Sequence, residues 1–429
     1  MLVSALWAMI GTMAHAQTNG SNSPYSRYGY GLLSDGAQGF NKGMSGLSYG
    51  MRGGNLLNTQ NPASIAALDS LTFLYDLGIT LQNANISDGT NKVNAKNSSF
   101  DYLTAGFRLG RGLGVYVGMR PFSTIGYDVA STETLSDAGT GSSTVTHTNS
   151  GNGGFHEAGV GLGWNPFGGL SIGAEFNYFW GDYTRSTVST YSQSGVQPLN
   201  RYYTAEINSY RIGFGAQYDA KINKNNNLTL GAVYRLGHDI GSEAVYYNQR
   251  LSSSGSVISG DTVRISKAFS LPTTIGAGVV WTNRNRLRIG FDYTLELWKD
   301  LHFAELGSNG TYSLSTDYFT NRSSYTLGFD YKPNPEGLRY RDHITYRFGV
   351  KYSTPYIKVD GYDGPKSYLV SAGVGLPISN LYNVGNTLNL SVQWEHVKPS
   401  RTSMITENYL RLSVGLTFNE SWFMKWKVK

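Results

Sequence analysis

The sequence predicts an all-β fold, a transmembrane antiparallel β-barrel of about 14 strands with an N-terminal plug (hatch) in the lumen. The main observation is a period-two run from Leu71 to Leu81, in which apolar side chains alternate with polar or glycine residues. Similar runs recur along the rest of the chain. They are as long as a tilted strand must be to cross a bilayer. We therefore interpret them as the wall of a membrane barrel.

The composition agrees with a barrel. The chain has 429 residues with 53 Gly, 31 Tyr and only 15% charged residues, and its mean hydropathy is -0.29. No uncharged apolar run reaches the roughly 18 residues that a spanning helix needs. A soluble β-sandwich is the alternative for any alternating pattern, but its strands are shorter. The strand lengths favour the barrel.

The residue types that carry most chemistry are scarce or scattered. The chain has no Cys, and its seven His show no metal-ligand spacing. No Ser, His and acid set can be placed for nucleophilic catalysis. The formal charge of +6 is not gathered into a dense Lys/Arg stripe. We therefore predict a protein that is not an enzyme, with no cofactor, no metal and no nucleic-acid partner.

Four regions follow from these patterns. Residues 1–16 are predicted to be a signal peptide, because an apolar run precedes the small-x-small sequence Ala14-His15-Ala16. Residues 17–68 are irregular and glycine-rich, as a plug would be. Residues 69–418 form the predicted barrel, and residues 419–429 form a basic aromatic tail in the periplasm.

The connections between the runs alternate in length. Short links such as 110–112 and 165–169 alternate with polar segments that we expect to be long loops, at 131–154, 186–203, 240–267 and 299–322. Bacterial barrels place short turns in the periplasm and long loops outside. We therefore predict the outer membrane of a Gram-negative cell, with both termini periplasmic. An even strand count then requires residues 71–81 to pair with residues 410–418.

A family resemblance rests on three stretches. The glycine-rich run that leads through Asn61-Pro62-Ala63 into the first strand resembles the hatch of the FadL/TodX (OmpP1) family of outer-membrane transporters of hydrophobic compounds. The segments Leu271–Trp281 and Asp292–Trp298 are similar to later parts of that family. Ser64 stands where the family usually has Gly, as in a divergent, Bacteroidetes-like member. The resemblance implies a plugged barrel that takes up fatty-acid-like or aromatic compounds.

Two sets of candidate site residues lie in the predicted lumen. The plug set is Gly53, Gly54, Leu56, Leu57, Asn61, Pro62 and Ala63. The second set consists of charged residues on the polar parity of the strands. Mixed signs on neighbouring strands predict pairing across the lumen, which would hold the plug to the wall and keep the interior from being an open pore. Its members are Asp76, Glu175, Arg211, Arg235, Arg288, Asp292, Asp330, Arg347 and Arg411.

A third set marks an expected break in the wall. After Met119 the third predicted strand contains Pro121, whose backbone cannot donate a hydrogen bond to a neighbouring strand. Ser123 follows at a position that the alternation places on the outward face. The candidate residues are Pro121, Phe122, Ser123, Thr124 and Gly126. The FadL resemblance implies a kinked third strand there that opens the barrel sideways into the bilayer. An ordinary bulge at the rim is the alternative.

Two functions remain open at this stage. The first is a passive channel for hydrophobic small molecules, in contact with outer-membrane lipid and lipopolysaccharide. The second is a non-transporting barrel that serves as a structural partner of other envelope proteins, in a secretion or assembly machine.

Overall fold

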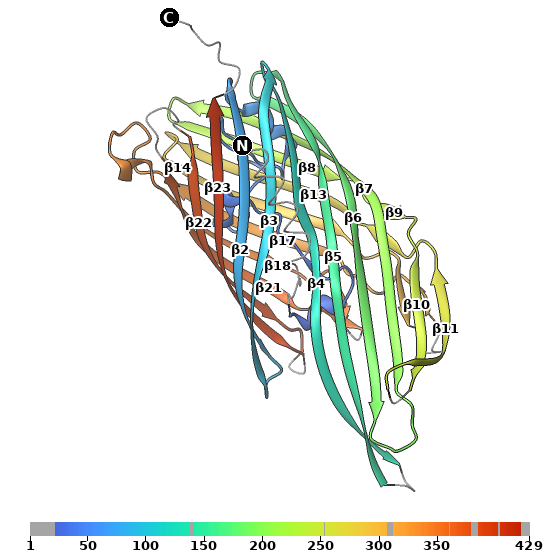
Figure 1. The fold of residues 1–429 in the computed structure, drawn as a ribbon. Helices are drawn as coiled ribbons and strands as arrows, with labels where there is room; N and C mark the ends of the chain where they lie inside the picture. The colour runs from blue at the N-terminus through green and yellow to red at the C-terminus, as the bar shows by residue number, and fades with distance from the viewer. Residues whose placement is uncertain are drawn as a thin grey trace, which may run out of the picture.

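The computed structural model describes residues 22–137, 141–252, 254–306, 312–359, 361–378, 385–401 and 404–421. The predicted signal peptide and residues 422–429 of the predicted tail lie outside these ranges. The described chain is almost entirely β-structure (Figure 1). None of its helices is long and apolar enough to cross a membrane.

Seventeen strands form one sheet, and fourteen of them close into an antiparallel barrel. The barrel strands are β2 (Thr72–Ser87), β3 (Lys92–Gly110), β4 (Leu113–Asp137), β5 (Gly141–Phe167), β6 (Leu170–Tyr191), β7 (Leu199–Asn223), β8 (Asn226–Arg235), β13 (Thr273–Asn283), β14 (Leu287–Leu297), β17 (Arg322–Tyr331), β18 (Thr345–Ser353), β21 (Lys366–Pro377), β22 (Thr387–Lys398) and β23 (Thr406–Ser421).

The remaining elements line or cap the barrel. The other strands of the large sheet are β1 (Leu32–Leu33), β10 (Ala244–Leu251) and β11 (Val257–Ile265). Small strand pairs are β9 (His238–Ile240) with β12 (Phe269–Leu271), β15 (Phe303–Leu306) with β16 (Tyr312–Ser315), and β19 (Lys358–Val359) with β20 (Tyr362–Asp363). The helical turns are η1 (Pro24–Arg27), α2 (Gly39–Lys42), η2 (Pro62–Ala67) and η3 (Tyr340–His343).

The barrel closes where the sequence predicts. β2 pairs antiparallel with β23 along its whole length, from Thr72 opposite Ser421 to Ser87 opposite Thr406. The predicted 14-strand antiparallel barrel and its closing pair are therefore confirmed. β23 continues three residues past the predicted barrel end at Phe418.

The side chains of the wall are arranged as in a membrane barrel. On β2, Ile79 and Leu81 face outward and are 47% and 54% exposed, whereas Asp76 and Thr80 on the opposite face are 1% and 3% exposed. On this strand the outward side chains are mostly apolar, and charged and polar side chains lie on the inward face. A soluble sandwich has the opposite arrangement, because its apolar faces meet in the core.

Several segments that we expected to be loops are strands instead. β4 and β5 continue their ladder through residues 131–137 and 141–154, and β6 and β7 pair through residues 186–189 and 199–202. These strands are 22 to 27 residues long, while a bilayer needs only about 9–11. The prediction was wrong because a strand beyond the bilayer need not carry the apolar alternation that reveals it.

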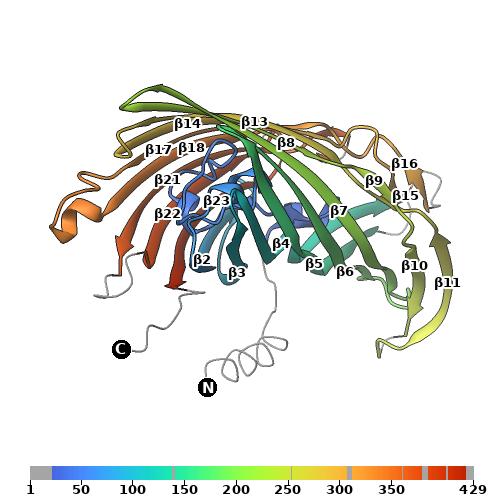
Figure 2. The ribbon, with the colours of Figure 1, turned by 90° about the horizontal axis from the view of Figure 1, so that it is seen from above.

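Residues 22–68 lie inside the ring of strands, where Figure 2 shows them in blue. Met44 and Leu47 are fully buried and pack with Val280 of β13. Leu57 and Ile65 form a second buried cluster with Tyr116 of β4. The first residues of this region reach the opposite half of the barrel, where Tyr30 joins a large aromatic cluster. We call residues 36–68 the plug and residues 22–35 the N-terminal segment.

The plug backbone rests directly on glycines of the wall. A Cβ atom on Gly349 would lie 2.3 Å from the carbonyl carbon of Met44, and one on Gly231 would lie 2.0 Å from the carbonyl oxygen of Tyr49. Non-bonded atoms do not approach so closely, so no side chain fits at either position. Plug backbone atoms occupy the space in the same way at Gly114, Gly163 and Gly173, and side-chain atoms of Asn61 and Pro62 do so at Gly215.

This contact gives a first prediction. Replacing Gly349 with Leu should displace the plug without preventing barrel formation, because the ladder of β18 does not depend on the lumen side chain. The measurement is conductance in planar bilayers, which should rise. Gly168→Leu is the control, since a Cβ at Gly168 would meet no atom within 4 Å. An unchanged conductance in a folded Gly349→Leu barrel would contradict the close contact.

Candidate functional site

The barrel wall is interrupted between β3 and β4. The two strands pair only from Gly110 opposite Leu113 to Leu103 opposite Met119. Beyond that point β3 pairs only with β2, and β4 continues along β5. Figure 1 shows β3 and β4 diverging toward the lower end of the view. The split begins just before Pro121, whose backbone has no N–H to donate.

The N-terminal segment covers the edge of β4 that β3 has left. β1 pairs with residues 123–124, and the N–H of Ser34 donates to the carbonyl of Phe122 at 2.9 Å. Further along, the N–H of Gly126 donates to the hydroxyl of Ser26 at 3.2 Å. Unpaired backbone groups are costly at membrane depth. The segment therefore stabilises the free edge of β4.

A β-bulge lies at the split. The register of β4 against β5 shifts between Pro121 and Ser123, which leaves Phe122 as the extra residue. Phe122 contacts Phe179 of β6 edge-on at 5.1 Å. Ser123 is only 1% exposed, so its expected outward orientation was wrong. The bulge exchanges the two faces of the strand, so the alternation before Pro121 does not continue after it.

A cavity of about 200 Å³ lies at the split. Its lining comes from the free part of β3, from β4 and from the N-terminal segment, and it continues into the lumen. Apolar side chains contribute, among them Leu33 and Phe100, but most of the lining residues are polar or charged. The polar residues at the β3 edge are Asn97, Ser98, Ser99 and Asp101.

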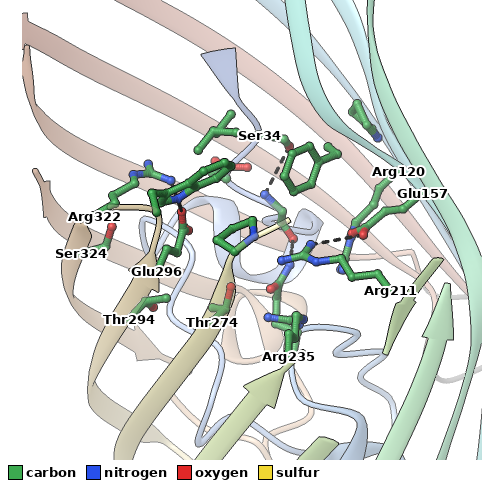
Figure 3. Close-up of a pocket in the computed structure, with 18 of the residues that line it drawn as sticks. Ser34, Arg120, Glu157, Arg211, Arg235, Thr274, Thr294, Glu296, Arg322 and Ser324 are labelled. Atoms are coloured by element: carbon green, nitrogen blue, oxygen red, sulfur yellow. Dashed lines mark hydrogen bonds and ion pairs between the residues drawn. The ribbon is translucent and has the colours of Figure 1, made fainter. Parts of the chain in front are cut away.

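A second cavity, of about 100 Å³, adjoins the first deeper in the lumen (Figure 3). Residues 33–35, Pro121, Arg322 and Lys351 line both cavities. Asp35 lies deep inside the barrel, yet its side chain is exposed to these cavities. Removal from bulk water raises the pKa of Asp35, but the charges of nearby lysines outweigh this effect and hold the pKa below its usual value.

One group of lumen charges surrounds the smaller cavity. Glu157 of β5 is shared between Arg120 and Arg211, with an N–O distance of 3.3 Å to Arg211. Arg235 of β8 pairs with Glu175 of β6 at 2.8 Å. These pairs join neighbouring or next-neighbouring strands of the wall.

A second group lies on the other side of the lumen. Asp330 of β17 is shared between Arg288 at 3.0 Å and Arg347 at 3.2 Å. Arg411 of β23 pairs with Glu395 of β22. The ion pairs of the predicted charges thus join wall strands to one another. For these residues the expectation that pairing across the lumen holds the plug to the wall was wrong.

Two predicted lumen carboxylates have partners other than cations. Asp292 accepts hydrogen bonds from the backbone N–H groups of Ser48 and Tyr49 in the plug, at 2.6 and 3.0 Å. Asp76 accepts from the hydroxyls of Tyr102 and Thr417, both at 3.1 Å. Asp292 therefore holds the plug to β14, while Asp76 links three wall strands.

The predicted Asn-Pro-Ala element starts η2. The side-chain oxygen of Asn61 accepts from the N–H of Ala63 at 3.1 Å, and Pro62 occupies the first helical turn. The amide of Asn61 donates to the carbonyls of Tyr49 at 2.9 Å and of Ala216 in β7 at 3.2 Å. One side chain thus caps the turn and fastens it to the wall.

The other predicted plug residues have packing roles. Leu57 is buried among apolar side chains, and Leu56 lies against the cluster around Met44. Gly54 accepts from the N–H of Asp69 at 3.0 Å, and a Cβ there would meet the Asp69 carboxylate. Gly53 has only ordinary contacts.

Sequence reasoning missed other residues of the site. Lys42 of the plug pairs with Asp101 of β3 at 2.8 Å. Arg120 lines the smaller cavity, and Tyr30 lies at the centre of the aromatic cluster. Arg120 lies on the polar face of its strand and next to Pro121, so the alternation of the strand could have identified it as a residue of the site. Lys42 and Tyr30 lie in irregular segments, where no periodic pattern indicates which way a side chain points.

The Lys42–Asp101 pair gives a second prediction. Lys42→Met should lower the free energy of unfolding by about 3–5 kcal/mol, because it leaves the enclosed Asp101 carboxylate without its cation. Adding Asp101→Leu should recover much of that loss. Urea unfolding in detergent measures both. Arg264→Met is the control, since the Arg264–Glu243 pair is exposed and should cost less than about 1 kcal/mol. Equal losses in Lys42→Met and Arg264→Met would contradict a buried tether.

The fold is shared with solved structures that include two toluene transporters. The toluene transporter TodX of Pseudomonas putida has a TM-score of 0.59 and 16% identity, covering 92% of this chain and 100% of that chain. The toluene transporter TbuX of Ralstonia pickettii has a TM-score of 0.58 and 13% identity, covering 89% and 98%. A FadL homologue of Pseudomonas aeruginosa has a TM-score of 0.58 and 14% identity, covering 87% and 97%. The predicted FadL-type fold is confirmed.

Comparison of the sequence itself identifies the family. A search of the curated proteins finds no match to this chain. A family model described as BamG matches residues 1–429. This chain therefore belongs to the BamG family.

Proposed function

We propose that this protein is an outer-membrane channel through which hydrophobic compounds pass by way of the split between β3 and β4. The ends of the barrel with short turns, including the C-terminal end of β23, face the periplasm in this proposal. The long strands β4 to β7 extend outside the cell. The substrates are fatty-acid-like or aromatic molecules, and neighbouring outer-membrane lipid receives or delivers them.

The observation that carries this proposal is the position of the larger cavity. It lies where the β3–β4 ladder ends at Met119, and both strand edges contribute to its lining. Elsewhere around the barrel the described strands pair without such a break. A cavity at a wall split connects the lumen with the bilayer. A molecule that moves sideways avoids exposing its apolar surface to water, which costs roughly 25 cal/mol per Å².

The plug keeps this route separate from the periplasm. Asp292 and Asn61 fix the plug backbone to wall strands, and lumen glycines leave no space beneath it. A lateral route needs no displacement of these contacts. The N-terminal segment is the part of the chain that borders the route.

A narrowing of the split tests the channel. Ser99→Trp places a bulky side chain in the cavity lining, because Ser99 lies opposite the inward-facing Thr80, and we expect it to slow uptake of toluene or a long-chain fatty acid severalfold. Lys96→Trp is the control, because Lys96 is exposed on the same strand and does not line the cavity. Uptake is compared in cells at matched surface levels. Equal uptake by both variants and the parent would count against passage through the split.

A second candidate function is that of a structural partner in an outer-membrane complex, such as a secretion or assembly machine. The observation that favours it is an exposed loop at the short-turn end. Residues 332–344 project from the barrel between β17 and β18, the orange loop of Figure 1. Leu338 is fully exposed and Tyr340 is 55% exposed. Exposed apolar residues at a rim are typical of protein contacts.

Charges placed on this loop test the partner role. Leu338→Asp with Tyr340→Asp should abolish co-migration of the barrel with envelope partners on native gels, while the barrel itself still forms. Val257→Asp with Ile258→Asp is the control, since these side chains are 55% and 54% exposed on β11. Complexes that survive the loop change, or that are lost equally in both variants, would argue against docking at this loop.

A further inference from the structure

The smaller cavity is lined by an unusual number of cations. Four of them belong to strands β4, β7, β8 and β17, and the fifth to β18, so they approach from different parts of the wall. Figure 3 shows the first four around the cavity. They are Arg120, Arg211, Arg235, Arg322 and Lys351.

Two of these cations form one-to-one ion pairs. Arg235 pairs with Glu175 at an N–O distance of 2.8 Å, and Arg322 pairs with Glu296 at 3.4 Å. Lys351 interacts at longer range with the carboxylates of Asp35, Glu296 and Glu395. Each of these three cations therefore has carboxylates that oppose its charge.

The other two cations share one carboxylate. Glu157 contacts both Arg120 and Arg211, so this group carries one positive charge in excess. The side chain of Glu157 is 3% exposed and that of Arg211 is 10% exposed. An uncompensated charge in such an enclosed place is unfavourable, and a bound anion removes the imbalance.

Two buried polar atoms at the cavity have no hydrogen-bond partner among the described residues. They are Nε of Arg211 and the hydroxyl oxygen of Thr274. Both residues line the cavity. Buried donors are nearly always satisfied in proteins, so each of these atoms indicates a missing acceptor.

The sheet register brings these donors together. Thr274 of β13 lies opposite Arg235 of β8, and Arg235 lies opposite Gly213 of β7. Arg211 is two residues along the same face of β7 from Gly213, which has no side chain to separate the neighbouring arginines. Three adjacent strands thus present two guanidinium groups and a hydroxyl to one space (Figure 3).

We propose that this cavity is a binding site for a small oxyanion of the phosphate class, either free phosphate or the phosphate of a lipid headgroup. The cavity volume of about 100 Å³ exceeds what one water needs, about 10–15 Å³. Guanidinium groups match the oxygens of phosphate by geometry and charge. This site does not require passage of a substrate through the wall.

Titration of inorganic phosphate into the purified full-length barrel tests the site by calorimetry. Arg211→Gln should weaken binding about tenfold or more, because it removes the excess charge and a charge-assisted donor. Glu157→Gln should tighten binding, since it removes a competing carboxylate. If the parent does not bind phosphate, or if Glu157→Gln weakens binding as Arg211→Gln does, the proposal is overturned.

A matched control separates the site from general lumen charge. Arg288 also shares a carboxylate with a second arginine, through Asp330, but it lines neither of the two cavities described above. Arg288→Gln should leave phosphate affinity unchanged. Equal losses in Arg288→Gln and Arg211→Gln would overturn the proposal. If Arg211→Gln does not fold, Thr274→Val removes a single unpaired hydroxyl and should weaken binding severalfold.

The source of the phosphate is distinguished with a short-chain phosphatidic acid. If the site holds a lipid headgroup, this lipid should bind more tightly than inorganic phosphate, and Ser99→Trp at the split should weaken its binding. If the site holds a free ion, inorganic phosphate should bind at least as tightly, and Ser99→Trp should leave its binding unchanged. Either result supports the oxyanion site, and neither depends on hydrophobic transport.

Discussion

The close contact between the plug backbone and the lumen glycines is the constraint on which the rest of this structure depends. A Cβ atom at Gly349 or Gly231 would overlap the plug, so the wall can enclose the plug only where it lacks side chains. Because these positions are occupied by backbone, the charged residues of the lumen are confined to the spaces between them. The two cavities and the ion pairs around them occupy the remaining volume. The plug thus determines both what the lumen holds and where it is open.

At the split in the wall, too, a segment from elsewhere in the chain fills the space that a wall strand leaves. β3 and β4 separate at Met119, and the backbone groups of β4 would be unpaired there without another strand. The N-terminal segment supplies that strand through Leu32 and Leu33, and its aromatic residues extend into the cluster that fills the lumen toward the extended ends of β4 to β7. The break is therefore a built feature of the fold, in which one stretch of chain substitutes for a neighbouring strand. Pro121 and the bulge at Phe122 place it at a defined height.

For the proposed channel, the lining of the split bears on the kind of molecule that would pass. A purely apolar passage would suit hydrocarbons, but Asn97, Ser98 and Asp101 make one side of the opening polar. An amphipathic molecule fits such an opening better than an unsubstituted hydrocarbon, because its polar group can remain hydrogen-bonded while its apolar part faces lipid. Buried ion pairs are weak evidence for stability. Their arrangement around a cavity is more readily explained by what the cavity holds.

By itself the sequence determined the architecture of the wall, because strand periodicity is a local property. The runs around Leu77 and Leu416 predicted their strands, and the closing pair followed from an even strand count. Pro121 marked the position of the split between β3 and β4 for the same reason, because a missing backbone N–H interrupts the ladder at that residue. Only the tertiary structure decided which charges meet, that Ser123 turns inward after the bulge, and that Lys42 reaches Asp101. These relations join residues distant in sequence through irregular chain, where no repeating pattern records the direction of a side chain.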